Sequence, residues 1–428
     1  MRPWLAKSWT TSPDRLTVTV NLRPGTAFHD GSKLTGQIVA QILNGTLPRT
    51  MGPIFEDVSS LSASADEVRI VLRRPSPLVL EALDGDAPIV KPGNPTIGTG
   101  PFKDVGKPPE IQLRANDDYY LGRPSIAGLT IEQYPSVRAA WADLLRNRVD
   151  ALFEVPTDAL DSLEASSNVS VFAVSRAYQY AILLNTSSPA LRSAAVRRGL
   201  NAAIDRSALV DRALGGHGIE SVGPVWVKNW AFDSKLPTTH LDYSQAKADL
   251  STFPRAADGR GKLTIRCLVP ADSVYERIAL VAKQQLEAFG VELSLEEQPP
   301  ARIAETVEKH EFEAVLLDFV SGPSLFRPYQ WWHTGGPFNF ARFSSPAVDA
   351  ALDRIRHAAS DDEYRAGVAA FQRAMLDDPP AIFLAWSQRA RAVSNRFLVP
   401  PPESGRDILS TIWQWRLRPD AADADKSR

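Results

Sequence analysis

A loop rich in aromatic and basic residues is the part of the sequence that points most directly to chemistry. It follows Phe319 and reads VSGPSLFRPYQWWHTGGPFNFARF, without a helical or strand period. Trp331 and Trp332 are adjacent and cannot both face one core, so we expect at least one to line a cleft or an interface. Binding pockets have mostly apolar and aromatic walls with few polar anchors. The candidate anchors are Asp318, Ser321, Arg327 and Asn339.

This composition favours non-covalent binding, but a structural interpretation stays open. In that interpretation the aromatic residues pack the loop onto its own lobe and the charged groups face solvent. Residue types alone do not orient a loop, so the sequence leaves both possibilities standing.

Motifs for catalysis or metal binding are weak. Ser244 and Lys247 form an S-x-x-K, the spacing at which a lysine can activate a serine on one helical turn, but neither S-D-N nor K-T-G accompanies it. The six histidines are scattered, and H-E-x-x-H, G-x-S-x-G and G-x-G-x-x-G are all missing. His29 has no ligand partners at suitable spacing and is interpreted as part of a turn. We therefore predict no catalytic residue, no metal site, no cofactor and no enzyme.

Composition excludes several other classes. The chain has 428 residues, 44% hydrophobic and 23% charged, with a formal net charge of -2, so charge gives no reason to expect nucleic acid or an anionic membrane as partner. The single cysteine, Cys267, cannot form an intramolecular disulfide and is expected to be a small core residue. No apolar run is long enough to span a bilayer, and no signal peptide is visible at the start.

The elements before the loop alternate between strands and helices. Residues 262–269, 291–295 and 313–319 are predicted strands, and residues 273–289 and 301–309 are predicted helices between them. Sheets wound in this way bind ligands beyond the carboxyl ends of their strands. That rule places the aromatic loop after Phe319 at a binding edge.

The stretch from Tyr178 to Gly218 joins one folded half to the other. Residues 180–185 form an apolar run typical of a strand buried on both faces, which belongs in a parallel or mixed sheet. A helix from about Arg192 follows. Asp205 is placed to cap a second helix, residues 206–214, and Gly215 can end it in the left-handed conformation.

The first half is predicted to be mixed as well. Alternation from Leu16 to Leu22 indicates a half-buried strand, and residues 68–72 indicate another. Residues 129–134, 137–146 and 151–155 read as strand, helix and strand, which implies a right-handed parallel crossover. Residues 169–174 and 180–185 are predicted as two further strands. Two amphipathic helices over SSPAVDAALDRIRHAASDDEYRAGVAAFQRAMLDD and a strand over PPAIFLAW close the second half, and the tail from Pro419 is predicted to be disordered.

Several motifs in order resemble those of the family 5 extracellular solute-binding proteins. PWLAKSW, LTVTVNLRPGTAFHDG and LTGQIVAQIL resemble the family's opening, IGTGPF resembles its GTGPY/F turn, and Asn185 followed by AAVRRGLNAAIDRSALVDRALGG resembles its VRxAxxxAIDR segment. Asn147 stands where the family usually has Gly. In this comparison Trp4 and Trp9 look like core aromatics. The resemblance runs from Pro3 to about Trp415.

The resemblance implies an α/β, two-lobed periplasmic-binding-protein fold of the type II, large peptide-binding class, with an extra subdomain in the first lobe. The expected domains are residues 1–92 as that subdomain, 93–188 as the first-lobe core, 189–385 as the second lobe, and 386–428 as a return to the first lobe with a polar tail. It also implies a monomer that captures a peptide or other small solute between its lobes and delivers it to an ABC transporter permease. Its expected location is the periplasm, or the outside of the cell in association with the membrane.

The resemblance further implies ligand contacts near the hinge. Tyr178 and Tyr180 lie where the hinge strand meets the cleft, and Trp386 lies on the return strand. In peptide-binding members an aromatic residue is followed three positions later by an Asp that pairs with the peptide amino terminus. Phe319 stands in the aromatic place here, but Gly322 occupies the place of the acid. Peptides are therefore less favoured than the nickel chelates, sugars, opines and other small solutes that the family also binds.

The start departs from the family, whose members ordinarily carry a signal peptide and an initial strand before PxLAxSW. We expect that the natural product begins upstream and is exported. The alternatives are a cytosolic ligand sensor or a degenerate remnant, and, less favoured, a serine hydrolase using Ser244.

Overall fold

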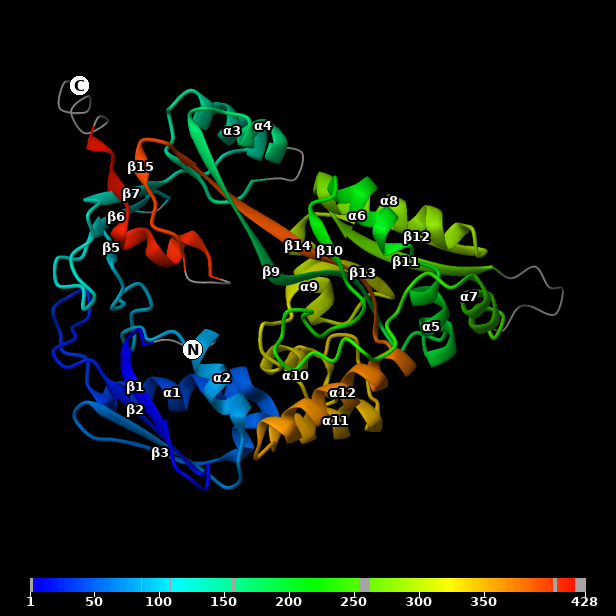
Figure 1. Ribbon diagram of the computed structural model, residues 1–428, viewed down its shortest axis with the longest axis horizontal. Coiled ribbons are helices and arrows are strands. Elements are labelled where there is room, and N and C mark those ends of the chain that lie inside the picture. Colours follow the sequence, from blue (N-terminus) through cyan, green and yellow to red (C-terminus); the bar gives the residue numbers. More distant parts are fainter. Residues whose placement is uncertain are drawn as a thin grey trace.

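The computed structural model describes residues 3–85, 87–107, 109–155, 159–253, 262–402 and 406–419. The described residues form a four-stranded, a seven-stranded, a three-stranded and a two-stranded sheet with helices packed on them. Figure 1 shows two groups of elements around a central opening, joined at the top by the long strands β9 (Val169–Leu184) and β14 (Ala381–Ser394). We call the group on the left the first lobe and the group on the right the second lobe.

The seven-stranded sheet is mixed, as the apolar run at residues 180–185 predicts. Its order is β10-β14-β9-β13-β11-β12, with β8 paired to β14. β11 pairs in parallel with both β12 and β13, whereas β9 is antiparallel to β13 and β14. The strands not yet given are β8 (Ala151–Leu152), β10 (Gly218–Glu220), β11 (Leu263–Pro270), β12 (Val291–Gln298) and β13 (Ala314–Val320).

One prediction about this sheet is wrong: residues 169–174 and 180–185 are not two strands. They belong to the single strand β9, which pairs with β14 along most of its length. The polar residues between the two apolar runs interrupt the hydrophobic pattern, and the pairing with β14 shifts register there, but the strand continues through them. The chain therefore crosses between the lobes on two adjacent, hydrogen-bonded strands.

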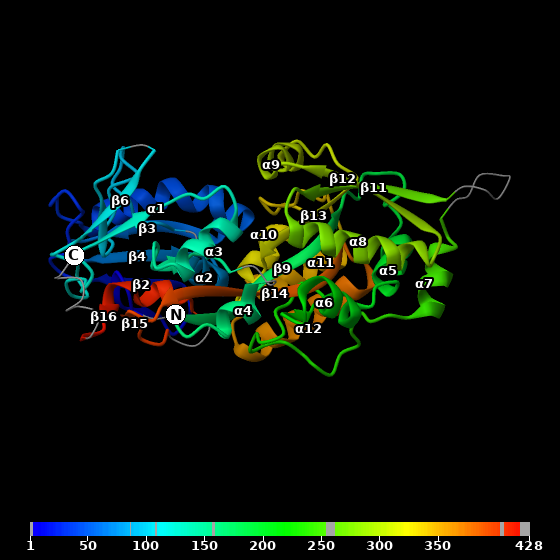
Figure 2. The same cartoon turned by 90° about the horizontal axis from the view of Figure 1, so that it is seen from above.

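Helices of the second lobe cover both faces of the sheet and form two separate cores. Successive residues of β13 point to opposite faces, and accordingly Leu316 lies in one buried cluster and Val315 in the other. The cluster with Leu316 is completed by α5 to α8, and the cluster with Val315 by α9 to α12. Figure 2 shows these helices to the right of α1 and α2. The helices are α5 (Ala194–Ala202), α6 (Arg206–Leu214), α7 (Tyr243–Leu250), α8 (Ser273–Glu287), α9 (Pro300–Glu308), α10 (Phe326–Trp332), α11 (Pro346–Arg356) and α12 (Asp361–Asp377).

Local signals determine where α6 begins and ends, as predicted. The Asp205 side chain accepts a hydrogen bond from the backbone N–H of Ala208 at 3.0 Å, and Gly215 ends the helix with φ 60°. The preceding helix, α5, instead buries two polar residues. Arg197 donates to backbone carbonyls of residues 191, 192 and 379, and Asn201 donates to those of residues 197 and 381.

Residues 3–85, which we call the N-terminal unit, form an antiparallel sheet of order β1-β2-β4-β3 with two helices. Their buried residues belong to the same cluster as those of α10 to α12, so the N-terminal unit packs on the second lobe. Its elements are β1 (Ala6–Thr11), β2 (Thr17–Leu22), α1 (Gly36–Met51), η1 (Gly52–Asp57), β3 (Val58–Ala63), β4 (Glu67–Leu72) and α2 (Pro77–Gly85).

Trp4 and Trp9 are not the core residues that the sequence predicts. Trp4 is 36% exposed and Trp9 is half-buried on β1, at the edge of the sheet. An edge strand has a partner on one side only, which leaves its large side chains less covered. His29, by contrast, lies in the predicted turn, where its ring nitrogens are 3.1 Å from the carbonyl oxygen of Gly100 and 3.3 Å from the amide nitrogen of Gly98.

The rest of the first lobe does not contain the predicted parallel crossover. β7 (Gly128–Ile131) lies in the antiparallel sheet β5-β6-β7, whereas β8 pairs antiparallel with β14 in the large sheet. The helix between them, α3 (Val137–Leu145), is as predicted, and Asn147 after it has φ 57°, which explains why glycine is usual there. The other elements are β5 (Phe102–Asp104), β6 (Ile111–Ala115), α4 (Leu160–Glu164), β15 (Phe397–Leu398), η3 (Ile408–Gln414) and β16 (Arg416–Leu417).

Two earlier predictions are not decided here. The domain boundaries at residues 92, 188 and 385 stay predictions, and the tail beyond Pro419 lies outside the described residues. None of the helices in the described part of the chain is both long and apolar enough to cross a membrane.

Candidate functional site

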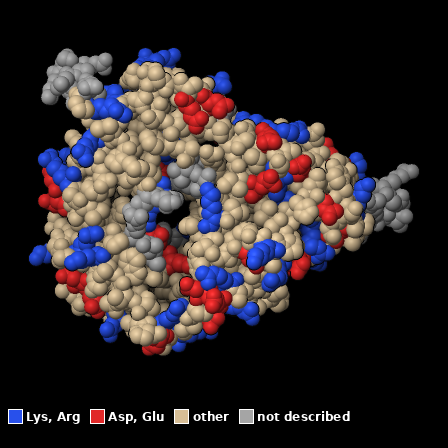
Figure 3. Space-filling model, viewed as in Figure 1, with Lys and Arg blue, Asp and Glu red and all other residues tan. Residues whose placement is uncertain are grey.

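The candidate site lies where β9 and β14 pass from one lobe to the other. Val320, the last residue of β13, pairs with Tyr178 of β9, so the carboxyl end of β13 reaches this crossing. Figure 3 shows a hollow between the lobes on the face of the molecule that it displays. The alternation of residues on β9 and β13 then divides the predicted binding residues between the two faces of the sheet.

One group lies on the face covered by α8. Tyr180 pairs with Asp318 in register, and its ring makes an edge-to-face contact with Tyr275 of α8, with the ring centroids 5.6 Å apart. The Tyr275 hydroxyl donates a hydrogen bond to Asp318 Oδ1. Tyr178 is half-buried and two residues before Tyr180 on β9, hence on the same face. Together they place aromatic rings and one carboxylate at the carboxyl end of β13.

A second group lies on the opposite face. Phe319 packs against Trp331 and Trp332, with ring centroids 4.4 Å and 5.7 Å away. Trp332 is 0% exposed and makes a further contact with Phe383, so in this conformation it belongs to the core. Trp331 is half-buried and contacts Phe338 and Phe340 as well. Of the two adjacent tryptophans, Trp331 is therefore the one that keeps exposed surface.

We predicted that the segment carrying these tryptophans has no regular structure. That prediction is wrong for part of it. Residues 326–332 form the helix α10, and its apolar side packs between the sheet and α11. The segment is only seven residues long and contains Pro328, so its sequence has too few positions to establish a helical period.

Ser321 and Trp386 form a third group with Trp226. The Ser321 hydroxyl donates to the carbonyl oxygen of Pro224 at 2.7 Å, and the indole of Trp386 meets that of Trp226 edge to face at 4.9 Å. Both predicted residues are buried under the segment that contains Trp226. They pack between the crossing strands and the segment that contains Trp226.

The surroundings of Gly322 leave little room for a side chain. A Cβ atom on Gly322 would lie 3.1 Å from the Cβ atoms of both Ala177 and Trp226. Such distances are tighter than ordinary packing contacts, so a larger side chain would have to displace β9 or the Trp226 segment. The close packing of Ala177 and Trp226 therefore fits glycine at position 322.

Arg327 and Asn339 are held within the loop itself. Arg327 Nη1 donates to Gln330 Oε1 at 3.2 Å. The Asn339 amide donates to the carbonyl oxygens of Thr334 and Phe343 and accepts from the Phe343 backbone N–H at 2.9 Å, so it ties the loop together. It also lines a surface cavity of about 330 Å³ with His310, Phe340 and Arg342.

The sequence analysis did not select Phe153, which is the most exposed large apolar residue among those described. Its ring is 70% exposed, and the guanidinium carbon of Arg391 lies 3.8 Å from the ring centroid. Arg391 in turn pairs with Asp407 at 2.9 Å. Successive residues of a strand point to opposite faces, and Leu152 is buried. The strand predicted over residues 151–155 could therefore have indicated that Phe153 is exposed.

Features needed for other chemistry are weak in the structure. In the described ranges, no three His, Cys, Asp or Glu side chains are grouped so as to hold a metal ion. Ser244 and Lys247 are both exposed on α7, outside the crossing. Burial raises the pKa of Cys267 to about 12, which makes that thiol a poor nucleophile.

A two-lobed α/β protein crossed by two strands, with an aromatic edge beside a hollow, is the architecture of a solute-binding protein. Comparison with known proteins agrees with this class. Residues 1–339 match the family described as bacterial extracellular solute-binding proteins, family 5 Middle, and the chain belongs to that family. The members to which it is similar are binding proteins and not enzymes, which confirms the prediction from sequence.

Similar proteins include both peptide and metal-chelate binders. The chain is 23% identical over 407 residues to the probable D,D-dipeptide-binding periplasmic protein DdpA of Escherichia coli (strain K12), which covers 89% of this chain and 78% of that protein. The structure of NikZ from Campylobacter jejuni in complex with Ni(L-His) has a TM-score of 0.85 and 22% identity, covering 97% of this chain and 91% of that one.

The oligopeptide-binding protein AppA from Bacillus subtilis, solved with a nonapeptide, has a TM-score of 0.84 and 22% identity, covering 97% of this chain and 90% of that one. These likenesses confirm the two-lobed fold.

Proposed function

We propose that this chain is the solute-binding component of an ABC importer, which captures a peptide or other small solute between its lobes and delivers it to a permease on the outer side of the membrane. The observation that carries the proposal is the meeting of the aromatic carboxyl edge of β13 with the two strands that cross between the lobes. Ligands of wound α/β sheets bind at such an edge. Family membership supports the same function.

Within the cleft, Tyr178 and Trp331 are the residues we expect to contact the solute directly. Both are half-buried, so each has covered surface that fixes its position and open surface that a ligand can cover. Tyr180, Asp318, Phe319, Ser321, Trp332 and Trp386 are proposed to shape the edge. Arg327, Asn339 and Phe153 are proposed to contribute at its margins.

The solute class follows from the relatives and from Gly322. One similar protein is named for D,D-dipeptides, and two others were solved with Ni(L-His) and with a nonapeptide. With Gly322 packed against Ala177 and Trp226, the position three residues after Phe319 offers no carboxylate to an ammonium group. A buried ammonium without a partner is costly. We therefore propose solutes whose recognition does not need an acid at that position, with chelates and opine-like solutes ahead of free peptides.

A thermal-shift screen of the purified chain against peptides, sugars, opines and nickel–histidine tests the proposal. Binding to the folded state raises the melting temperature. For the ligand that does so, Trp331→Ala is expected to raise Kd at least about tenfold, since burying an aromatic face contributes more than about 1.4 kcal/mol. Tyr243→Ala removes an exposed aromatic residue of α7 and serves as the matched control. A ligand bound equally well by Trp331→Ala and by the parent would contradict the proposed site.

A further inference from the structure

The N-terminal unit contacts helices α10 to α12 and so connects the two lobes a second time, apart from β9 and β14. Along the chain, residues 3–85 reach the second lobe only through the first lobe and then through β9 or β14. In space, the same residues pack directly on α10, α11 and α12, on the side of the hollow away from the crossing strands (Figure 1). The lobes are thus joined by chain at one end of the hollow and by side-chain contacts at the other.

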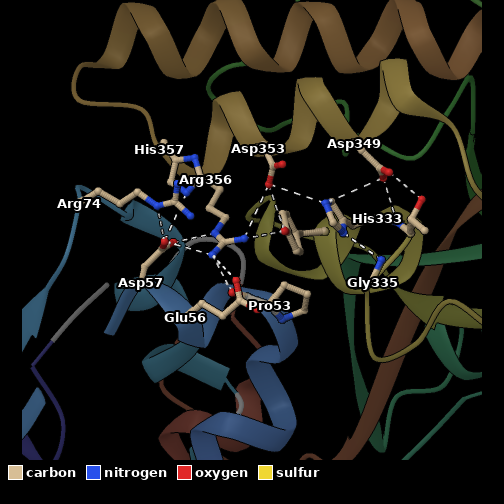
Figure 4. A network of polar contacts seen from close by, with 12 residues as sticks. Pro53, Glu56, Asp57, Arg74, His333, Gly335, Asp349, Asp353, Arg356 and His357 are labelled. Carbon is tan, nitrogen blue, oxygen red and sulfur yellow. Dashed lines mark hydrogen bonds and ion pairs between the residues drawn. The ribbon is translucent and has the colours of Figure 1, made fainter. Parts of the chain in front are cut away.

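A buried ion pair lies at the centre of this contact. Asp57 of η1 is 0% exposed and Arg356 of α11 is 4% exposed, and they meet in two hydrogen bonds of 2.6 and 3.0 Å (Figure 4). Arg74 Nε donates to the same carboxylate at 2.7 Å, and His357 Nε2 lies 3.4 Å from it. Burial alone would raise the pKa of Asp57, but the neighbouring His357 and the hydrogen bonds from Arg356 and Arg74 hold it well below its ordinary value.

Arg356 also binds other groups on both sides of the contact. Its Nη2 donates to the carbonyl oxygen of Pro53 at 2.6 Å, and its Nη1 donates to the Tyr329 hydroxyl at 3.0 Å. Tyr329 stacks on His333 with ring centroids 4.4 Å apart, and its hydroxyl is 3.2 Å from Asp353. One guanidinium therefore orients groups on η1, α10 and α11 together.

Further contacts join the N-terminal unit to the second lobe. Gln330 of α10 donates to the carbonyl oxygen of Thr50, and the Tyr364 hydroxyl donates to Glu81 of α2 at 3.0 Å. A Cβ atom on Gly335 would lie 3.0 Å from Pro53 Cγ, so the two surfaces meet closely. We refer to Asp57, Arg74, Tyr329, Arg356 and His357 as the clasp.

A buried ion pair is a weak source of net stability because removing two charges from water offsets their attraction, but it strongly specifies one arrangement of its surroundings. If the lobes separate around β9 and β14, the clasp must come apart and its charges regain water. We propose that the clasp is the closing contact of the two lobes and sets the fraction of closed molecules in the absence of solute. This inference rests on the proposed function, since a solute that binds the closed form pays less when that form is already populated.

Electron–electron double resonance on spin-labelled variants tests the clasp without any solute. Cys267 is buried, so labels can be placed at Ser62→Cys in the N-terminal unit and Tyr243→Cys on α7. We expect one short distance in the parent, and in Asp57→Asn and in Arg356→Met a second population at longer distance. Arg302→Ala, which removes an exposed ion pair with Glu305 on α9, is the control and should leave the distance unchanged.

A second label pair, Ser62→Cys with Val105→Cys, lies within the first lobe and should keep its distance in every variant. A change in that pair would mean that the N-terminal unit had detached from the first lobe, and would overturn the proposal. So would an unchanged distance between Ser62 and Tyr243 in folded Asp57→Asn and Arg356→Met.

If the clasp variants do not fold, a cross-link in the otherwise native chain also tests whether the lobes are closed in the absence of solute. Pro53→Cys and Gly335→Cys place two thiols on the facing surfaces, and oxidation would join the N-terminal unit to the loop after α10. Because the proposal holds that the native clasp keeps most molecules closed, the cross-link should form readily, and small-angle scattering should give the same radius of gyration for the oxidised and the reduced form. A cross-link that fails to form, or a smaller radius after oxidation, would show that the lobes are apart without solute and would overturn the clasp as a closing contact. The solute screen plays no part in these measurements, so failure of the proposed function is recognised separately.

Discussion

Charged and polar residues buried between the N-terminal unit and the second lobe are the clearest departures from ordinary core composition. Asp57 and Arg356 form one pair there, and Glu81 of α2, which is half-buried, accepts a hydrogen bond from Tyr364 across the same contact. Burial raises the pKa of Glu81 to about 7, in spite of hydrogen bonds from Tyr364 and Ser324 that act in the opposite direction. The pKa values of the two carboxyl groups thus shift in opposite directions. Asp57 has two guanidinium partners, whereas the hydrogen bonds to Glu81 come from neutral groups.

The raised pKa of Glu81 makes stability depend on pH. The folded state holds the proton more tightly than the unfolded chain does, so this group favours folding below its ordinary pKa of 4.5 and that advantage is lost as pH rises through about 7. Glu81→Gln keeps a neutral acceptor for Tyr364. We expect the variant to gain up to about 3 kcal/mol over the parent at pH 8, and little at pH 4.

Urea unfolding of the parent and Glu81→Gln at both pH values measures the difference. Glu308→Gln, on the exposed side of α9, is the control and should track the parent. A constant offset between Glu81→Gln and the parent across this range would show that Glu81 does not titrate with a raised pKa.

At the scale of elements, the ends of helices are set by one or two residues each. α6 begins at the Asp205 cap and ends at the left-handed Gly215, and α12 begins at the Ser360 cap with three acidic residues in its first turn. The capping side chains accept hydrogen bonds from backbone N–H groups that have no partner inside the helix, and the acidic residues are attracted to the positive end of the helix dipole. The limits of α6 could therefore be predicted to the residue.

Removing the cap of α6 should destabilise the protein modestly. Asp205→Ala leaves the Ala208 amide without its acceptor at the helix start, which typically costs about 1 kcal/mol. Asp211→Ala, an exposed position of the same helix that carries no cap, should change stability by less than about 0.5 kcal/mol. Chemical denaturation measures both. Equal effects of the two substitutions would count against the capping role.

For the whole molecule, the seven-stranded sheet separates two apolar cores in the second lobe, and β9 and β14 carry that sheet into the first lobe. Cys267 lies in the core on the α8 side, fully covered by the helices there. Because it is the chain's one cysteine, its thiol reports the integrity of that core.

We expect Cys267 to react with a thiol reagent at the rate of unfolding of the second lobe. In native buffer at pH 8 the reaction with an aromatic disulfide should be slow, and in urea one equivalent should react at once. Leu280→Cys, which is exposed on α8, is the control and should react immediately under both conditions. Rapid reaction of Cys267 in native buffer would show that this core opens locally.

The sequence predicted several residues that the fold brings together, but not their division between the two faces of the sheet. Phe319, Trp331 and Trp332 do come together, and Tyr180 and Asp318 come together, yet the two groups lie on opposite faces of the sheet. Ser321 and Trp386 are covered by Trp226, which the sequence analysis did not select. Residue type indicates that a group can bind, whereas its orientation depends on which segment covers it.

The sequence by itself determined the family, the alternation of β11 to β13 with α8 and α9, and the limits of α6, because periods and caps act over a few neighbouring residues. Only the tertiary structure decided that residues 169–184 are one strand, that β7 and β8 lie in different sheets, and that Asp57 meets Arg356. Those outcomes depend on contacts between distant segments, whose free energy comes from burial and pairing that no local pattern records.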